Sequence, residues 1–345
     1  ILYLAAFFFG FSDENIRIPS FAGYDFKLRV KDDVIQPEEP LEVRFELESS
    51  PFEPFAKKLS LMDKGYDVMS CKIKKTSRYN TRPLVSGIVC LKKYVRQLSE
   101  LYFDDEKDNQ KYPLPLFAAF LTEDIHTIRK MSMPHFNRNA SRPTAGYYDC
   151  LLGNGLYSYW IRHMLTLVDE GQNLEEVEII KKAVMQCFGD NILSDMIISP
   201  MRERVFYRFS DGREVDSELL PTGYKRLISI VTDLSARCAL LNRRIYGMDA
   251  CAKTVGTVLI DEIDLHVYPL LQMVVLKALS TVFPNLQFII TTNTPMVIAG
   301  FEPNEDNALY RLYYSAEKDS YGLVKKQVPP LSVYGKLRET FNQVF

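Results

Sequence analysis

The chain has 345 residues, of which 47% are hydrophobic and 25% are charged. Such fractions are typical of folded globular proteins, so they exclude a disordered chain, a collagen-like repeat and a coiled-coil rod. With 42 basic and 44 acidic side chains the net charge is -2, which predicts no long-range attraction of the whole surface to nucleic acid or membranes.

The glycine and cysteine contents argue against several kinds of binding and redox site. Only 16 residues are glycine, about 4.6% against roughly 7% in average proteins, so glycine-rich phosphate-binding loops are scarce. The six cysteines have no C-x-x-C pair, which argues against a zinc ribbon or a redox dithiol and indicates buried, reduced thiols in a cytoplasmic protein. They are Cys71, Cys90, Cys150, Cys187, Cys238 and Cys251.

The first residues, ILYLAAFFFGF, form an apolar run that is too short to span a membrane and has no basic flank typical of a signal peptide. As a helix, residues 1–9 have no N-cap, so we expect the helix to begin upstream of Ile1. Residues 24–48 alternate apolar and polar positions around a break at 36–40. This pattern predicts antiparallel strands with one solvated face.

Residues 51–110 have a helical pattern and a local excess of positive charge. Between Lys57 and Arg96 there are 11 basic and 2 acidic residues, a balance of +9. Such a run is most often a solvated face, but it could also contact a phosphate backbone. The candidates for that contact are Lys72, Lys74, Lys75, Arg78 and Arg82, with Tyr79 among them.

Strands and helices alternate through the rest of the chain. We expect a buried strand at 113–121, two helices within 146–190, a strand at 205–209 with a turn at Asp211-Gly212, and an amphipathic helix at 219–241. Then come a strand at 257–260, a helix at 270–282, a strand at 286–291, a short helix from Pro295, a hairpin at 309–314 and 322–326, and a terminal helix from Val333. This order predicts an α/β fold with a mostly parallel sheet.

The strongest chemical signal is the apolar strand 257–260, which ends in Asp261 and Glu262. Ligands of open α/β sheets bind beyond the carboxyl ends of the strands, where one acid can hold Mg²⁺ and the next can orient or deprotonate water. A pair of solvated acids is the plain alternative. Thr291, Thr292 and Asn293 follow the next buried strand, so both strands should present polar ends to one crevice. Thr294-Pro295 also fits a helix N-cap, which would make part of this polarity structural.

At this point the segments TVLIDEIDLHVYP and LQFIITTNTP resemble the Walker B, D-loop and switch regions of ABC-type ATPase heads in the RecF, SMC and OLD-like branch. The resemblance is strongest to a group described as predicted ATP-binding proteins involved in virulence, which is similar to Septu-type antiphage ATPases. The segment DGREVDSELLPTGYKRLISIVTDL resembles its signature helix, and AGYYDCL and SVYGKLRETFNQVF resemble its recurring stretches, so the likeness covers about residues 113–345.

The resemblance implies a role for individual residues. Asp261 corresponds to the magnesium acid, Glu262 to the catalytic glutamate and Asn293 to the switch position, while Asp264 and His266 lie in the D-loop region. In the signature, Thr222 and the helix N-terminus would offer donors to phosphate of ATP held by the opposite subunit. The remaining signature residues are Gly223, Tyr224, Lys225 and Arg226.

The resemblance also implies an ABC-type head with a central mixed sheet, an antiparallel β-subdomain and helical insertions. Its parts would be the start of the ATPase lobe (1–50), a basic helical insertion (51–110), a strand with a helical subdomain and hairpin (111–218), and the signature, Walker B, switch and C-terminal helix (219–345). ATP and Mg²⁺ would bind between the subunits of a homodimer or higher oligomer. This assembly would control a separate effector, which is an HNH-type nuclease in such antiphage systems. No membrane partner is expected.

Four departures from the family pattern bear on catalysis. Pro221 replaces a serine and Asn293 a histidine, Tyr268 replaces the second histidine of L-H-x-H-P, and no G-x-x-x-x-G-K-[ST] occurs. Because asparagine cannot take a proton near neutral pH, hydrolysis should be slow. We expect the chain to begin just after the phosphate loop and to be inactive alone.

Three alternatives stay open at this stage. The first is a DNA-binding clamp or repair ATPase of RecF/SMC type without a dedicated effector. The second is a structural scaffold that has lost ATP hydrolysis. The third is a mononuclear metal hydrolase built on Asp261, Glu262, Asp264 and His266, which is disfavoured because a strand alternates its side chains and would split the cluster.

Overall fold

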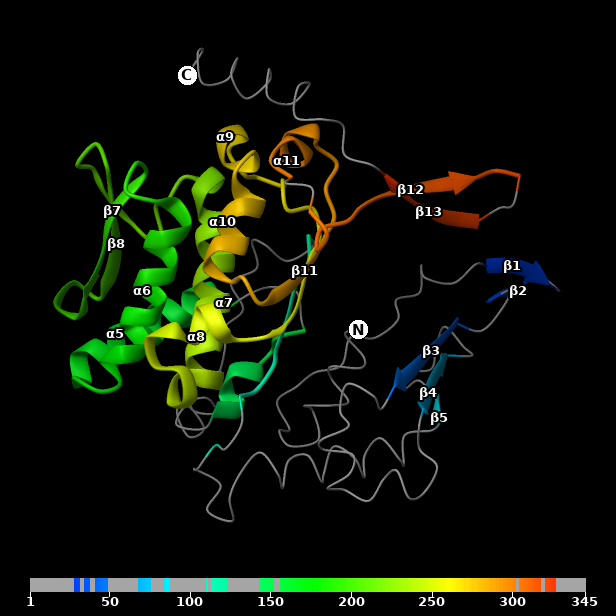
Figure 1. The fold of residues 1–345 in the computed structure, drawn as a ribbon, viewed down its shortest axis with the longest axis horizontal. Helices are drawn as coiled ribbons and strands as arrows, with labels where there is room; N and C mark the ends of the chain where they lie inside the picture. Colours follow the sequence, from blue (N-terminus) through cyan, green and yellow to red (C-terminus); the bar gives the residue numbers. More distant parts are fainter. Residues whose placement is uncertain are drawn as a thin grey trace.

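The computed structural model describes residues 110, 113–122, 143–151, 156–301, 304–317 and 320–326, and the backbone of strands at 28–31, 34–37, 41–48, 68–75 and 84–86. These residues form an α/β fold with parallel and antiparallel sheets, as predicted. The helices expected at 1–9 and from Val333 lie outside the described residues, as do Arg78, Tyr79 and Arg82. In Figure 1 the helices lie between β7 and β8 at the left and β11 further right.

The central sheet has the order β11-β10-β6, and its three described strands all run parallel. They are β6 (Leu116–Phe120), β10 (Gly256–Ile260) and β11 (Leu286–Ile290), close to the predicted ranges. At the start of β10 a Cβ on Gly256 would lie 1.9 Å from the Leu116 carbonyl oxygen, so only glycine fits this close pairing. The parallel register places the carboxyl ends of the strands at one edge.

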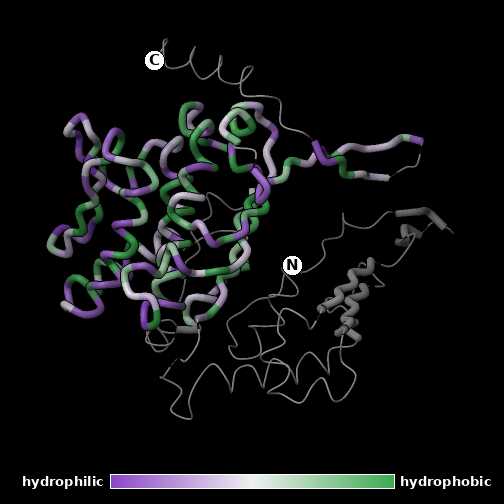
Figure 2. The backbone as a smooth tube through the Cα atoms, in the orientation of Figure 1, coloured by the Kyte–Doolittle hydropathy of each residue, from purple (hydrophilic) through white to green (hydrophobic). Residues whose placement is uncertain are grey.

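Helix α7 (Thr222–Tyr246) is the central element of the helical layer, and it packs on α5 (Tyr157–Glu170), α6 (Leu174–Phe188), α8 (Ala250–Lys253), β6 and the 3-10 turn η4 (Pro143–Tyr147). Although its sequence predicts an amphipathic helix, 16 of its 25 residues are buried. Neighbours therefore surround it on every side along most of its length. Figure 2 shows hydrophobic and hydrophilic residues mixed along the helices around it, as expected where each buries one face.

Asp233 and Arg237, two charged residues buried on α7, are hydrogen-bonded to neighbouring parts of the chain. Asp233 accepts bonds from the indole Nε1 of Trp160 (2.6 Å) and from the Leu156 amide (2.9 Å). Arg237, one turn later, donates to Asp233 (2.7 Å) and to the carbonyls of Gly146 and Tyr148 (both 2.8 Å). The AGYYDCL stretch is thus tied to the core through backbone carbonyls that a buried arginine satisfies.

An antiparallel sheet packs against α5 and α6. It comprises β7 (Leu193–Ser199), β8 (Arg204–Phe209) and β9 (Glu214–Asp216), with the predicted turn at Asp211-Gly212 between β8 and β9, while η5 (Pro200–Arg202) joins β7 to β8. The predicted hairpin near the C-terminus is also present as β12 (Leu309–Ser315) and β13 (Ser320–Lys326).

The predicted helix at 270–282 is broken in the structure. It forms α9 (Pro269–Gln272) and α10 (Val275–Val282), with Met273 and Val274 between them. Gly300, the residue after α11 (Pro295–Ala299), packs against this break, where a Cβ on Gly300 would lie 1.9 Å from the Met273 carbonyl oxygen. That tertiary approach is invisible in the local pattern. The predicted N-cap of α11 is confirmed, since Thr294 accepts a bond from the Met296 amide.

In the N-terminal part, β1 (Leu28–Lys31) pairs with β2 (Val34–Pro37), and β3 (Leu41–Glu48) with β4 (Val68–Lys75), which pairs with β5 (Leu84–Ser86). All pairs are antiparallel, as predicted for 24–48. The helical expectation for 51–110 is wrong for β4 and β5. Apolar residues alternate in β4, and the register sets Met69, Cys71 and Ile73 opposite Leu47, Phe45 and Val43. A period of two with a cross-strand partner favours strand over helix.

The four described cysteines are buried and form no disulfide, and burial raises the pKa of the Cys150 and Cys187 thiols to about 12. They therefore behave as small core side chains, as predicted. Within the described part, every helix is too short or too polar to cross a membrane.

Candidate functional site at the carboxyl ends of β10 and β11

The polar residues that follow β10 and β11 lie at one edge of the parallel sheet, as their positions predicted. The Asp261 amide donates to the Phe120 carbonyl (2.8 Å) and the Thr291 amide to the Ile260 carbonyl (3.0 Å), so both strands end together. The Thr291 hydroxyl then donates to the Asp261 carboxylate (2.5 Å) and accepts from the Glu262 amide (2.8 Å). One threonine therefore positions both acids.

Glu262 has a backbone conformation that non-glycine residues rarely adopt. Its φ is 45°, in the left-handed region, where a side chain has a steric cost. Its carboxylate accepts a bond from the Asn293 side-chain amide (3.1 Å) and is half-exposed. The strained turn thus directs Glu262 toward the loop after β11, and such strain is commonly found at functional sites.

Asp264 bridges the same two loops. Its Oδ1 accepts from the Thr292 hydroxyl and, at 3.3 Å, from the Asn293 amide. The main-chain amide of Asn293 therefore donates to Asp264, while its side-chain amide donates to Glu262. The sequence pointed to Asn293 and Asp264 separately, but not to the bond between them.

Arg226 is a buried member of the signature segment that turns toward its own chain. Its Nη2 donates to the main-chain carbonyls of Asp261 (2.8 Å) and Glu262 (3.0 Å). Burial lowers the pKa of the Arg226 guanidinium below its ordinary value, although the nearby carboxylates of Asp264, Asp261 and Glu262 act in the opposite direction. This contact joins the start of α7 to the acidic turn.

The first turn of α7 also meets the segment that follows the D-loop. The Tyr268 amide donates to the Gly223 carbonyl (3.2 Å), and a Cβ on Gly223 would lie 2.9 Å from the Tyr268 Cβ. The rings of Tyr224 and Tyr268 stack with centroids 6.4 Å apart, and Phe209 of β8 meets Tyr224 edge-on at 5.4 Å. Phe209 is part of this region that the sequence did not single out.

The other predicted residues have various surroundings. Thr222 and His266 are exposed, Lys225 donates to the Glu218 carbonyl (3.4 Å), and Pro221 precedes α7 without a side-chain cap. No hydrogen bond found in the described part of the chain joins Thr222 or Lys225 to Asp261 or Glu262. Within one chain, the signature therefore reaches the acidic turn through Arg226 and through the contact between Gly223 and Tyr268.

The donor set at this edge fits Mg²⁺. Asp261 and Thr291 offer a carboxylate and a hydroxyl oxygen, and Mg²⁺ is commonly held by one or two carboxylates together with waters and substrate phosphates. The described residues contain no group of three His, Cys, Asp or Glu side chains placed to hold a metal, so they give no support to a mononuclear hydrolase centre.

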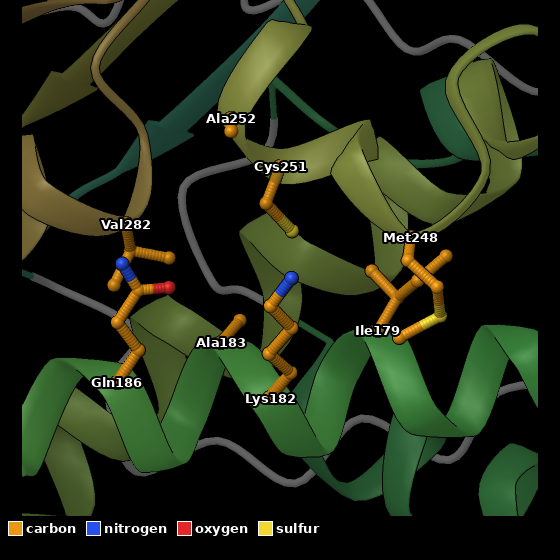
Figure 3. A pocket seen from close by; sticks show the side chains of 8 residues that line it. All are labelled: Ile179, Lys182, Ala183, Gln186, Met248, Cys251, Ala252 and Val282. Atoms are coloured by element: carbon orange, nitrogen blue, oxygen red, sulfur yellow. The ribbon is translucent and has the colours of Figure 1, made fainter.

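A small hollow lies away from these acids, between α6, α8, α10 and the 3-10 turn η6 (Gly247–Asp249) (Figure 3). Lys182, Met248 and Cys251 are among the side chains that line it. Its volume of about 20 Å³ is enough for one water molecule and far too small for a nucleotide.

Comparison with known proteins confirms the resemblance to Septu-type ATPases. The chain is 35% identical over 104 residues to the Vibrio cholerae serotype O1 biovar El Tor protein named Retron Vc95 probable ATPase, covering 30% of this chain and 20% of that protein. It is 30% identical over 149 residues to Septu protein PtuA of Bacillus mycoides (strain KBAB4), covering 43% of this chain and 19% of that protein. The chain thus spans about a fifth of the length of these relatives.

Among solved structures, the chain is similar to an SMC head bound to the C-winged helix domain of ScpA, with 13% identity and a TM-score of 0.44. The similarity covers 85% of this chain and 76% of that one. No protein-family model matches the chain.

Proposed function

We propose that this chain is part of the ATP-hydrolysing regulatory subunit of a bacterial antiphage defence system. The observation that carries the proposal is the single edge at which Asp261, Glu262 and Asn293 meet, in a chain whose relatives are named Septu and retron ATPases. Other folds place acids at strand ends too, but here the order of signature helix, acidic turn and switch loop also agrees with an ATPase head.

In the proposed mechanism Asp261, supported by Thr291, would hold Mg²⁺, which neutralises charge on phosphate oxygens when it is bound. The Glu262 carboxylate accepts the proton of the attacking water, and Asn293 keeps that carboxylate in place through its amide. Because Asn293 cannot exchange a proton as a histidine would, Glu262 carries the base role alone. This is the physical reason to expect slow turnover.

We further propose that ATP joins two copies of the protein as a homodimer or within a higher oligomer. The exposed Thr222 and the N-terminus of the long helix α7 would offer donors and a positive dipole end to phosphate on the second copy. Pro221 removes one backbone donor at this position, which weakens that contact. ATP hydrolysis would then open the assembly.

The proposed output is control of a separate effector nuclease, of HNH type by resemblance, in the cytoplasm, where the buried thiols stay reduced. The test is phage infection of cells that express the complete gene product with its neighbouring gene. We expect Asp261→Asn to abolish protection and Asp195→Asn, which alters an acid on β7 (Leu193–Ser199), to retain it. Full protection from Asp261→Asn, or protection without the neighbouring gene, would contradict the proposal.

A nucleic-acid-binding role is the second candidate, and one observation favours it. Lys72 and Lys74 alternate along β4 and therefore share one face of the antiparallel sheet, where the register sets Lys72 opposite Arg44. Glu42, opposite Lys74, and Glu46 lie on the same face, so positive charge is only slightly in excess there. Binding of duplex DNA that falls steeply with added salt, and that weakens in Lys72→Ala, would support this role. Lack of binding at low salt would exclude it.

A further inference from the structure

The acidic turn is held by hydrogen bonds from three separate elements. The Asp261 amide donates to β6 at the Phe120 carbonyl, and the Glu262 amide donates to the Thr291 hydroxyl beyond β11. The carbonyls of Asp261 and Glu262 accept from Arg226 of α7. Every backbone donor and acceptor of these two residues therefore has a partner within the chain.

Arg226 is the only one of these partners that is both charged and buried, with 5% of its surface exposed. One nitrogen, Nη2, serves two successive carbonyls at 2.8 and 3.0 Å, so it fixes the peptide unit between Asp261 and Glu262. Hydrogen bonds from a charged donor are stronger than neutral ones. Without Arg226 the Asp261 carbonyl would lose this partner, which is costly, whereas the Glu262 carbonyl would keep its bond from the Leu265 amide (2.9 Å). The arginine thus opposes relaxation of the left-handed φ of 45° at Glu262.

From this geometry we infer that Arg226 is a positioning residue: it holds the main chain of the acidic turn so that the Glu262 carboxylate stays directed at Asn293. It does not bind phosphate on a second copy. A side chain that is 5% exposed and already donates to its own chain has little surface to offer another subunit. The catalytic consequence rests on the proposed ATPase function, whereas the hold on the turn does not.

The two roles for Arg226 predict different kinetics. A phosphate contact would contribute to nucleotide binding, so its loss would raise KM and weaken ATP-driven association. A positioning contact acts on the orientation of the general base, so its loss would lower kcat and leave KM nearly unchanged.

The first test needs no nucleotide. Amide hydrogen exchange of the Asp261, Glu262 and Ile263 amides would be compared in wild type, Arg226→Met, Arg226→Lys and Arg243→Met. Arg243 is a matched control because it lies on the same helix 17 residues further along, roughly 25 Å away at 1.5 Å per residue. We expect exchange at least tenfold faster in Arg226→Met, an intermediate rate in Arg226→Lys, and the wild-type rate in Arg243→Met. Wild-type exchange in Arg226→Met would overturn the inference.

The second test measures ATP hydrolysis by the complete gene product. Arg226→Met should lower kcat by roughly tenfold or more with KM within about twofold, and Arg226→Lys should recover part of the rate, because an ammonium can still donate to both carbonyls. A raised KM with unchanged kcat would overturn the inference in favour of a phosphate contact. If wild type hydrolyses no ATP, the proposed function fails, while the exchange test still decides the role of Arg226. If Arg226→Met does not fold, Arg226→Lys is judged by the same two measurements.

Discussion

At the scale of single residues, the departures from the family pattern have structural partners. Tyr268, where a histidine is usual, stacks on Tyr224 and donates its amide to Gly223, so it packs the signature against the segment after the acids. Asn293, also at a histidine position, donates to Glu262. These replacements therefore retain contacts across the site while removing groups that can exchange a proton.

The contact between Asn293 and Glu262 predicts an effect on rate. Asn293→Ala removes the amide that orients the carboxylate, so kcat of the complete protein should fall by roughly tenfold or more, with ATP affinity little changed. Asn293→His, which keeps a donor and adds a group that can exchange a proton near pH 6.5, should raise the rate above that of wild type and make it depend on pH in that range. Steady-state ATP hydrolysis from pH 5.5 to 8 checks both, using roughly this window around the histidine pKa. An Asn293→Ala protein as fast as wild type would show that the contact has no catalytic role.

At the scale of elements, α7 connects the site to the core. Its first turn contacts the acidic turn through Arg226, and its middle carries the buried pair Asp233 and Arg237, which joins α5 and the stretch at 146–148. Their side chains are 1% exposed, so neither charge can turn to water. The stability of the fold and the geometry of the site therefore depend on the same helix.

This dependence predicts a large loss of stability when one partner is removed. Asp233→Leu leaves the Arg237 charge buried without its carboxylate and removes the acceptor of Trp160, so the free energy of unfolding should fall by about 3–5 kcal/mol. Asp169→Leu, an exposed acid on α5, should change it by less than about 0.5 kcal/mol. Urea denaturation of the two variants gives both values. Equal stability of the two variants would mean that the buried pair contributes little.

The β7–β8–β9 sheet predicts a sensitivity to acid. Burial acts to raise the pKa of Asp216, but the Glu218 amide and the Arg204 guanidinium outweigh it and hold that pKa below its ordinary value. A carboxyl with a lowered pKa in the folded state contributes stability above its unfolded pKa and loses it as the pH falls. The free energy of unfolding should therefore decline from about pH 5 to about pH 2. Asp216→Asn should show a shallower decline, and an identical slope in the variant would contradict this account.

Many of the helices and strands can be predicted from local sequence. The strands at 257–260 and 286–291, the helix pair within 146–190 and the N-cap at Thr294 depend on short-range pattern, and each is present within a few residues of its predicted bounds. The break at Met273 lies against Gly300, and strand β4 pairs with β3. Both are long-range contacts that no local window contains.

The candidate site likewise combines features that the sequence predicts with features that it does not predict. The meeting of Asp261 and Glu262 with Asn293 follows from parallel strands whose ends are polar. The inward turn of Arg226 and the stack of Tyr224 on Tyr268 do not, because they depend on where α7 enters the fold. A signature residue assigned by resemblance to phosphate binding thus proves to contact its own chain.

At the scale of the whole molecule, the exposed start of α7 and the acids have different roles in the proposed assembly. Thr222 would meet ATP on a second copy, while Asp261 and Glu262 act on ATP held by their own. ATP should therefore convert the complete protein to a larger species, and Thr222→Trp, which places a bulky ring at the exposed helix start, should prevent this. Light scattering with and without ATP·Mg²⁺ measures the change. A molar mass of the wild-type protein that is the same with and without ATP·Mg²⁺ would contradict an ATP site shared by two copies.

The central claim is that the turn after β10 carries the chemistry of ATP hydrolysis. The most direct measurement is the rate of phosphate release by the complete gene product, wild type against Glu262→Gln, with ATP binding followed in parallel. Glutamine keeps the size of the side chain and can still contact Asn293, but it cannot accept a proton from water. The account predicts that Glu262→Gln binds ATP normally and hydrolyses it at least roughly 10²-fold more slowly. Turnover of Glu262→Gln equal to that of wild type would contradict it.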